Sequence, residues 1–269
     1  MTYNDRMTML ARLGFGARGL VYVLIGWFAL DVALNGGQPT DNQGALGTLA
    51  RAPLGHILQA VCALGFAGYA VWRLTEAITD PEGRGGTLKG KFERLAYGFS
   101  GLAHVLLATA AARLALKQVA AKSGTPGDES AESWSGWLME QSGGVMLLVL
   151  AGVTLFAVAA AQAIKAFKAR FDELDGDVPA PTYVRWIGRL GYAARGLIFA
   201  LCGWFLISAA LSHDAERAGG LGEALRQLRA QDSGGIILAI VAVGLALFGL
   251  FSMIEARYRQ IRVKKPSFL

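Results

Sequence analysis

The hydrophobic positions of the chain gather into six long stretches separated by polar segments. The stretches lie at about residues 15–34, 54–78, 96–116, 143–165, 190–211 and 234–256. Each is close to the roughly 20 residues that a helix needs to cross the hydrocarbon core of a bilayer. Since a helix satisfies its own backbone hydrogen bonds in lipid, the pattern predicts six transmembrane helices.

The first, third and fifth stretches repeat one pattern. Its copies read ARLGFGARGLVYVLIGWFAL from Ala11, ERLAYGFSGLAHVLLATAAA from Glu93 and GRLGYAARGLIFALCGWFLI from Gly188. Small residues recur at spacings of three and seven, which puts them on one face of each helix. In lipid such faces let two helices approach closely. The predicted helix-packing glycines are Gly16, Gly19, Gly26, Gly98, Gly101, Gly196 and Gly203.

The repeat predicts three units of two helices each, at residues 1–80, 81–175 and 176–269. Because each unit has two spans, all units keep one orientation, and parallel repeats imply a pseudo-threefold axis along the membrane normal. A short amphipathic helix is expected at the outer membrane surface in the loop of each unit. Apolar residues of these loops include Trp134, Trp137, Leu138, Leu221, Leu225 and Leu228. The fold class is therefore an all-α integral membrane protein.

Composition agrees with this fold class. Hydrophobic residues make up 54% of the chain and charged residues 17%, against about 25% charged residues in a soluble domain. This excludes a disordered chain, a disulfide-stapled secreted domain and an ordinary cytosolic enzyme. The net charge of +6 comes mainly from basic residues at the N-terminus, after the second and fourth spans, and in the C-terminal tail. The positive-inside rule then predicts cytoplasmic termini, with the bilayer rather than nucleic acid as partner.

Charged residues near the predicted cytoplasmic ends vary together between units. The aligned positions are Arg18, Ser100 and Arg195 on the first helices, and Glu76, Gln162 and Glu255 on the second helices. An unpaired charge at membrane depth costs about 2.5–3.5 kcal/mol on insertion scales. We therefore predict the ion pairs Arg18–Glu76 and Arg195–Glu255 within units, with Ser100 and Gln162 as neutral equivalents. A hairpin clamp is the preferred interpretation, and gating or proton coupling is the alternative.

A second aligned set lies nearer the outer face. It consists of Asp31, Arg113 and Ser208. One interpretation is a polar site on the repeat axis, with Asp31 and Arg113 paired across units. The other is that these side chains snorkel to the outer interface. His104 aligns with aromatic residues of the other units, so it is expected in a packing slot, with a proton relay as the alternative.

Motifs for soluble chemistry are absent or lack their context. Residues 14–19 match G-x-G-x-x-G, but this run opens a membrane helix instead of following a strand. Residues 85–91 nearly spell a P-loop, yet Phe92 stands where a Ser or Thr is needed. No C-x-x-C, H-E-x-x-H or G-x-S-x-G occurs. We therefore expect no catalytic residue, no metal and no cofactor.

The repeated R-x-G-[FY]-x-x-R-G-L-[VI]-[YF], followed by G-W-F, resembles the bacterial Domain of Unknown Function 1206 family. Members are six-span membrane proteins made of three such units, and the resemblance covers nearly the whole chain. The middle unit departs from the pattern at Ala96, Ser100 and Thr109. The resemblance implies this architecture and a location in the bacterial inner membrane. It brings no activity, ligand or catalytic residue.

Three function classes are compatible with these observations. A non-catalytic scaffold or accessory subunit, with a membrane-protein partner or as a homo-oligomer, is favoured by the glycine faces and the lack of catalytic motifs. A small transporter or channel is favoured by the parallel repeats and the Asp31, Arg113 and Ser208 layer. A membrane enzyme has only its location in support. We expect the first of these classes.

Overall fold

The computed structural model describes residues 3–51, 53–79, 87–117, 126–168, 174 and 181–259. These residues form the helices α1 (Tyr3–Asn35), α2 (Asn42–Arg51), α3 (Gly55–Thr79), α4 (Leu88–Ala115), α5 (Pro126–Met139), α6 (Gly144–Lys168), α7 (Thr182–Ser212), η1 (Ala215–Arg217), α8 (Leu221–Arg229) and α9 (Gly234–Tyr258). Six of them, α1, α3, α4, α6, α7 and α9, are long and apolar enough to cross a membrane. The chain is thus a helical membrane protein.

The first helix of each unit begins well before its apolar stretch. α1 starts at Tyr3, α4 at Leu88 and α7 at Thr182, whereas the apolar stretches start at about 15, 96 and 190. The helical backbone continues through basic, polar residues, which hydropathy does not detect. At the start of α4 the Thr87 hydroxyl accepts a hydrogen bond from the Gly90 N–H (3.1 Å), so this extension carries its own N-cap.

The second helices of the three units are alike in length and in the way they begin. α3, α6 and α9 have 25 residues each. They start at Gly55, Gly144 and Gly234, where an added Cβ would lie 2.4, 1.5 and 1.9 Å from a carbonyl oxygen of the preceding short helix. Only glycine fits this tight corner, so the three helices share one register counted from their first residue.

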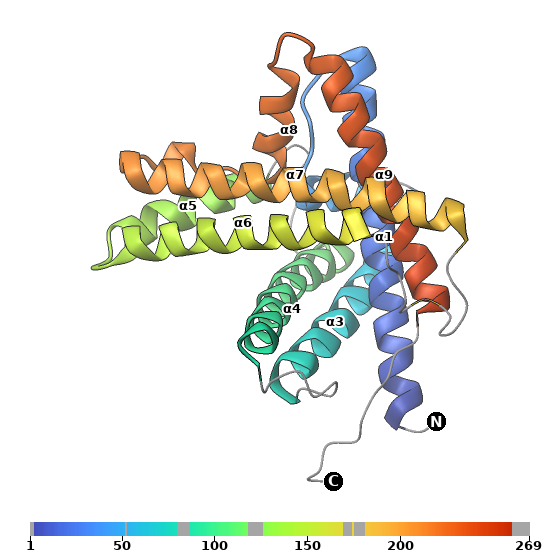
Figure 1. The fold of residues 1–269 in the computed structure, drawn as a ribbon. Coiled ribbons are helices and arrows are strands. Elements are labelled where there is room, and N and C mark those ends of the chain that lie inside the picture. Colours follow the sequence, from blue (N-terminus) through green and yellow to red (C-terminus); the bar gives the residue numbers. More distant parts are fainter. Residues whose placement is uncertain are drawn as a thin grey trace.

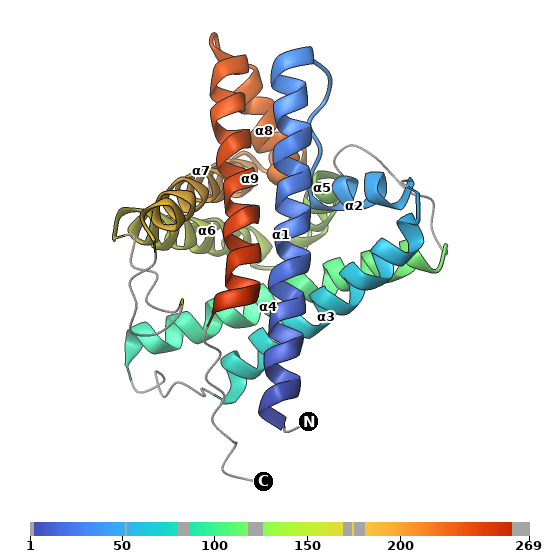
Figure 2. The same ribbon diagram turned by 90° about the vertical axis from the view of Figure 1, so that its right-hand side faces the viewer.

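The long helices pack as three pairs, and each pair joins the second helix of one unit to the first helix of the next. α3 packs on α4, α6 packs on α7, and α9 packs on α1, which closes the cycle. Figures 1 and 2 show that the three pairs cross steeply and do not stand side by side. Contacts within a unit are less extensive: α1 meets α3, and α7 meets α9.

The largest hydrophobic core lies where the three pairs cross. It includes Val21 and Ile25 of α1 and Phe66 of α3, together with side chains of α7 and α9. Leu225 and Leu228 of α8 are buried in this core, so they pack on the protein and not on lipid. α8 turns its apolar face toward the protein instead. Trp134 and Trp137 of α5 are exposed.

Candidate functional site

Two glycines form a close backbone contact between α1 and α9. A Cβ on Gly19 would lie 2.8 Å from the Gly249 carbonyl oxygen, and a Cβ on Gly249 would lie 2.6 Å from the Gly19 carbonyl oxygen. Because neither residue has a side chain, the two backbones touch. This contact brings Arg18, the neighbour of Gly19, against the last turns of α9.

Arg18 is buried at this contact, with 7% of the residue exposed, and each of its nitrogens has a partner. Nη2 lies 2.6 Å from Oε2 of Glu255. Nε donates to Oγ of Ser252 (3.1 Å) and Nη1 donates to Oη of Tyr69 (2.8 Å). The guanidinium therefore joins α1 to both α9 and α3. The rings of Phe15, Tyr69 and Phe248 surround it, with centroids 4.9, 5.2 and 5.1 Å from Cζ.

Two further arginines complete the cluster. Arg259 Nη1 lies 2.7 Å from the second oxygen of Glu255, Oε1. Arg73 donates through Nε (2.9 Å) and Nη2 (2.7 Å) to the Tyr69 hydroxyl. Its Nη1 lies 2.8 Å from Oε2 of Glu76. Tyr69, almost fully buried, is thus the acceptor that connects the two ion pairs.

The predicted pairing of Arg18 with Glu76 is wrong. Arg18 pairs with Glu255 across the boundary between the first and third units, and Glu76 pairs with Arg73 on its own helix. The physical reason is the helix pairing: α1 lies against α9 along its length, whereas it only crosses α3. Sequence periodicity places residues on a face but does not identify the helix that covers that face.

The prediction of an Arg195–Glu255 pair is wrong for the same reason. Both oxygens of Glu255 are taken by Arg18 and Arg259. Arg195 Nε donates to the Tyr22 hydroxyl (3.0 Å), and its guanidinium lies over the ring of Phe248 at 4.5 Å. No carboxylate pairs with Arg195 among the residues that the structure describes.

The shared register of α3, α6 and α9 also corrects the predicted neutral equivalents. Glu76, Lys165 and Glu255 each lie three residues before the end of their helix, and Arg73, Gln162 and Ser252 each lie six residues before it. Gln162 therefore corresponds to Arg73 and Ser252, one turn away from the glutamates. Ser100 of α4 remains at the position of Arg18. Its carbonyl accepts a hydrogen bond from the His104 ring N–H (2.7 Å).

This register reveals an exchange between two helix pairs. In α1 and α9 the cation is on the first helix, at Arg18, and a serine is on the second, at Ser252. In α4 and α3 the serine is on the first helix, at Ser100, and the cation is on the second, at Arg73. In both pairs one arginine bonds to a glutamate of the second helix. The arginine comes from the first helix in one pair, at Arg18, and from the second helix in the other, at Arg73. Arg73 and Arg259 could have been found from their helical spacing to Glu76 and Glu255, since residues three and four apart are neighbours.

The predicted polar layer on the repeat axis does not form. Asp31 and Arg113 are exposed, and the Asp31 carboxylate accepts a hydrogen bond from the Asn35 side chain on its own helix (2.7 Å). Among the described residues Asp31 and Arg113 make no ion pair. The helices α1, α4 and α7 that carry Asp31, Arg113 and Ser208 run in different directions (Figure 1).

The predicted packing glycines lie mostly between helices of successive units. Gly19 and Gly26 lie against α9, Gly101 lies against Leu74 of α3, and Gly196 and Gly203 lie against α6. Two differ from the rest. A Cβ on Gly16 would meet nothing within 4 Å, and a Cβ on Gly98 would meet only Ala77, at 3.8 Å.

His104 packs against Tyr69 and Phe66, with ring centroids 4.5 and 5.9 Å apart.

Two aspartates that sequence reasoning missed join the three outer loops. Asp41 accepts hydrogen bonds from the Gly44 N–H (2.8 Å), at the start of α2, and from the Gly127 N–H of α5. Burial raises the pKa of the Asp41 carboxyl, although both N–H donors oppose the shift. Asp128 of α5 accepts from the Gly220 N–H (2.8 Å), at the start of α8. The sequence gives only a weak signal for these two aspartates, because an Asp before a helix is common in any loop.

The chain is similar to known proteins over its whole length. It matches the Domain of Unknown Function (DUF1206) family at residues 13–80, 95–169 and 190–259. It is 33% identical over 258 residues to the uncharacterized protein YxxB of Bacillus subtilis (strain 168), which covers 94% of this chain and 92% of that protein. No solved structure matches the chain with significance.

Proposed function

The chain belongs to the DUF1206 family, and on that premise we propose that it serves as a non-catalytic scaffold or accessory subunit of a membrane complex. The proposal places it in the bacterial inner membrane with both termini in the cytoplasm. The basic residues near the start of α1, in the turn between α3 and α4, and after α9 support this orientation by the positive-inside rule.

The observation that carries the proposal is the mutual satisfaction of the buried charges. Arg18, Glu255 and Glu76 are each less than 10% exposed, and the carboxylates are met by guanidinium groups within 2.8 Å. Arg18 bonds across the unit boundary to Glu255 and Ser252, whereas Arg73–Glu76 and Arg259–Glu255 pair residues three and four apart in the sequence. A cluster of this kind stabilises one arrangement of helices, because breaking it leaves a charge unpaired in a medium of low polarity.

The layer that favoured a transporter lends no support, since Asp31 and Arg113 are exposed and make no ion pair within the described part of the chain. Transport of a polar solute needs polar groups that converge on a path through the membrane. The hydrogen-bonding groups of the cluster around Arg18 bond to other members of the cluster. A scaffold needs a fixed shape, which closure of the cycle by α1 and α9 provides.

The test is to extract the protein from its native membrane in polymer nanodiscs and to weigh the intact particles by mass spectrometry. A scaffold or accessory subunit is expected to carry a membrane protein at fixed stoichiometry. A matched control is the doubly exchanged variant Arg18→Ser with Ser252→Arg, which retains one cation for Glu255 and should retain the same partner. A lone chain, or a homo-oligomer, that carries a retained small molecule would contradict the proposal and favour transport.

A further inference from the structure

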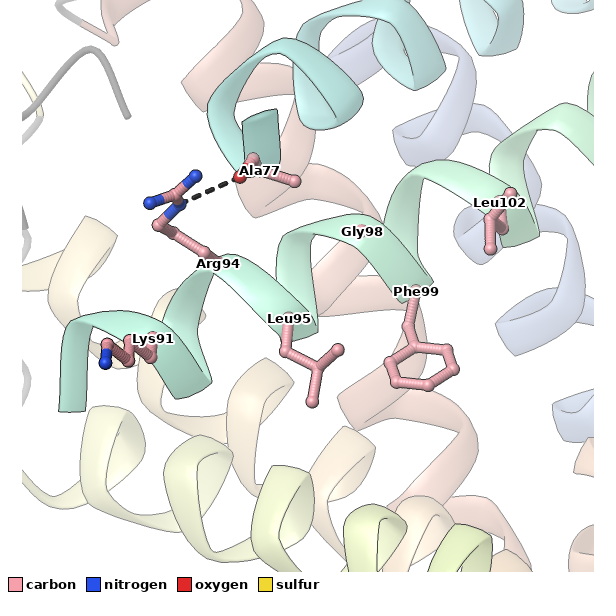
Figure 3. Close-up of a pocket in the computed structure, with 7 residues that line it drawn as sticks. All are labelled: Ala77, Lys91, Arg94, Leu95, Gly98, Phe99 and Leu102. Carbon is pink, nitrogen blue, oxygen red and sulfur yellow. Dashed lines mark hydrogen bonds between the residues drawn. The ribbon is translucent and has the colours of Figure 1, made fainter. Parts of the chain in front are cut away.

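A pocket of about 430 Å³ opens beside the first turns of α4. It is lined by Ala77 near the end of α3 and, along α4, by Lys91, Arg94, Leu95, Gly98, Phe99 and Leu102 (Figure 3). Both cations are at one end, and the apolar residues extend from them along the helix. Among the residues that the structure describes, no carboxylate lines the pocket.

Arg94 is held in place by the end of the neighbouring helix. Its Nε donates to the Ala77 carbonyl (2.8 Å), and its Nη2 donates to the Ile78 carbonyl (2.9 Å). These carbonyls belong to the last turn of α3, where no helical N–H is available to them. Within the described part of the chain, Nη1 of Arg94 and the ammonium of Lys91 make no hydrogen bond or ion pair. The pocket therefore holds one oriented guanidinium and one mobile ammonium.

The rest of the pocket is an apolar groove. Leu95, Phe99 and Leu102 are 54%, 56% and 56% exposed, and Gly98 between them leaves a hollow because it has no side chain. From Leu95 to Leu102 the helix rises about 10 Å at 1.5 Å per residue. This is the length of an acyl chain segment that reaches about two thirds of the way through one leaflet.

The groove exists because the middle unit lacks a contact that the other two units have. α1 packs on α3 and α7 packs on α9, but no comparable contact joins α4 to α6 among the described residues. The face of α4 that carries Leu95, Phe99 and Leu102 is therefore left uncovered at the entrance to the apolar span Glu93–Ala115.

We propose that this pocket binds a phospholipid with an anionic headgroup. The phosphate and headgroup lie against Lys91 and Arg94, and one acyl chain lies along Leu95, Phe99 and Leu102 over the hollow at Gly98. Arginine and lysine recognise phosphate oxygens, and basic residues at the edge of a span attract anionic lipids. A free soluble anion would use the two cations but would gain nothing from the groove that follows them.

The test is a lipid titration of the purified, delipidated chain, followed by native mass spectrometry. Phosphatidylglycerol and phosphatidylcholine with the same acyl chains are compared, and inorganic phosphate is added as a competitor. We expect phosphatidylglycerol to bind preferentially, and Lys91→Gln to weaken its binding by about five-fold, the effect of one basic residue near an anionic surface. We expect phosphate not to displace the lipid.

Gly98→Leu tests the groove separately from the charges. The new side chain occupies the hollow, and its Cβ meets only Ala77, at an ordinary distance of 3.8 Å. The matched control is Gly16→Leu, the same repeat position on α1, where nothing lies within 4 Å. Gly98→Leu is expected to reduce binding of both lipids, while Gly16→Leu leaves it unchanged.

Three results would overturn the proposal. These are equal binding of the two lipids, displacement of phosphatidylglycerol by inorganic phosphate, which would indicate a site for a free anion, and equal behaviour of the two leucine variants. Lys91→Gln keeps the test informative if Gly98→Leu fails to fold, because Lys91 is exposed and its side chain makes no hydrogen bond or ion pair with the described residues.

Discussion

Arg18 and Glu255 form an ion pair with 2.6 Å between Nη2 and Oε2, although 237 positions separate them in the sequence. They belong to the first and last long helices of the chain. The pair is buried. Arg18 also donates hydrogen bonds to Tyr69 and Ser252, and Glu255 also pairs with Arg259. The cycle of helices is therefore closed by charge as well as by the glycine contact beside it.

A double-mutant cycle on Arg18→Met and Glu255→Gln should show strong coupling. Each single variant leaves a buried group without its partner, so the double variant loses less stability than the sum of the two. We expect an interaction energy of about 1–3 kcal/mol, measured from unfolding in detergent. The same cycle on Arg18 and Glu76 serves as control and should show weaker coupling, because Arg18 is connected to Glu76 only through Tyr69 and Arg73. Equal coupling in the two cycles would refute the pairing described above.

Exchange of the cation between the helices should restore stability. Arg18→Ser removes the guanidinium from α1, and Ser252→Arg returns one from α9 at the position that Arg73 occupies on α3. We expect the double variant to recover most of the thermal midpoint lost by Arg18→Ser alone, as followed by the monodisperse fraction after heating. The register argument would fail if the double variant were no more stable than the single one.

The two glycine environments of α1 predict opposite effects of alanine. At Gly19 the new methyl group would meet the Gly249 carbonyl at 2.8 Å, so Gly19→Ala should destabilise the protein by about 1–3 kcal/mol through overpacking. At Gly16 nothing lies within 4 Å, and alanine should raise helix stability by up to about 1 kcal/mol. Thermal unfolding of the two variants in one detergent distinguishes them, and an unchanged stability of Gly19→Ala would contradict the α1–α9 contact.

Asp41 should make stability depend on pH in acid. Desolvation by burial raises the pKa of its carboxyl above the ordinary value of 3.8, against the bonds from Gly44 and Gly127. Since the folded protein binds this proton more tightly than the unfolded chain, the stabilisation is complete below pH 3.8 and is lost as the pH rises through the raised pKa.

Asp41→Asn cannot ionise, so the fall in unfolding temperature across this pH window should flatten in the variant. Asp31→Asn, at an exposed aspartate of α1, is the control and should retain the slope of the wild type. Parallel curves for wild type and Asp41→Asn would show that Asp41 is not the group responsible.

The six spans follow from hydropathy because lipid demands about 20 apolar residues wherever a helix crosses it. The partners of the helices do not follow, because a face of small residues such as that of Gly19 and Gly26 fits any helix with a similar face. The sequence predicts the charge cluster only in part, because it does not identify which helices are partners. Arg18 and Glu255 were both identified as residues that need a partner, but periodicity could not show that they meet each other.

The middle unit contains the position at which the predicted alignment of the second helices is wrong. Gln162 and Lys165 are both polar and lie one turn apart on α6, so either can be aligned with Glu76. The register is set by the glycine that begins each second helix. The close contact of this glycine with the preceding short helix is seen in the backbone of the structure and not in the sequence. Arg73 and Tyr69 were missed because neither has a counterpart of the same type in the other units.

Closure by α1 and α9 has a consequence for synthesis of the chain. A ribosome adds about 5–20 residues per second, so the carboxylate of Glu255 is made about 10–50 s after the guanidinium of Arg18. During that interval the cation that enters with the first span has no carboxylate of the ninth helix beside it. A nascent chain released before residue 255 keeps that defect, and a protease that recognises unpaired charge in membrane helices thereby gains a way to tell truncated copies from finished ones.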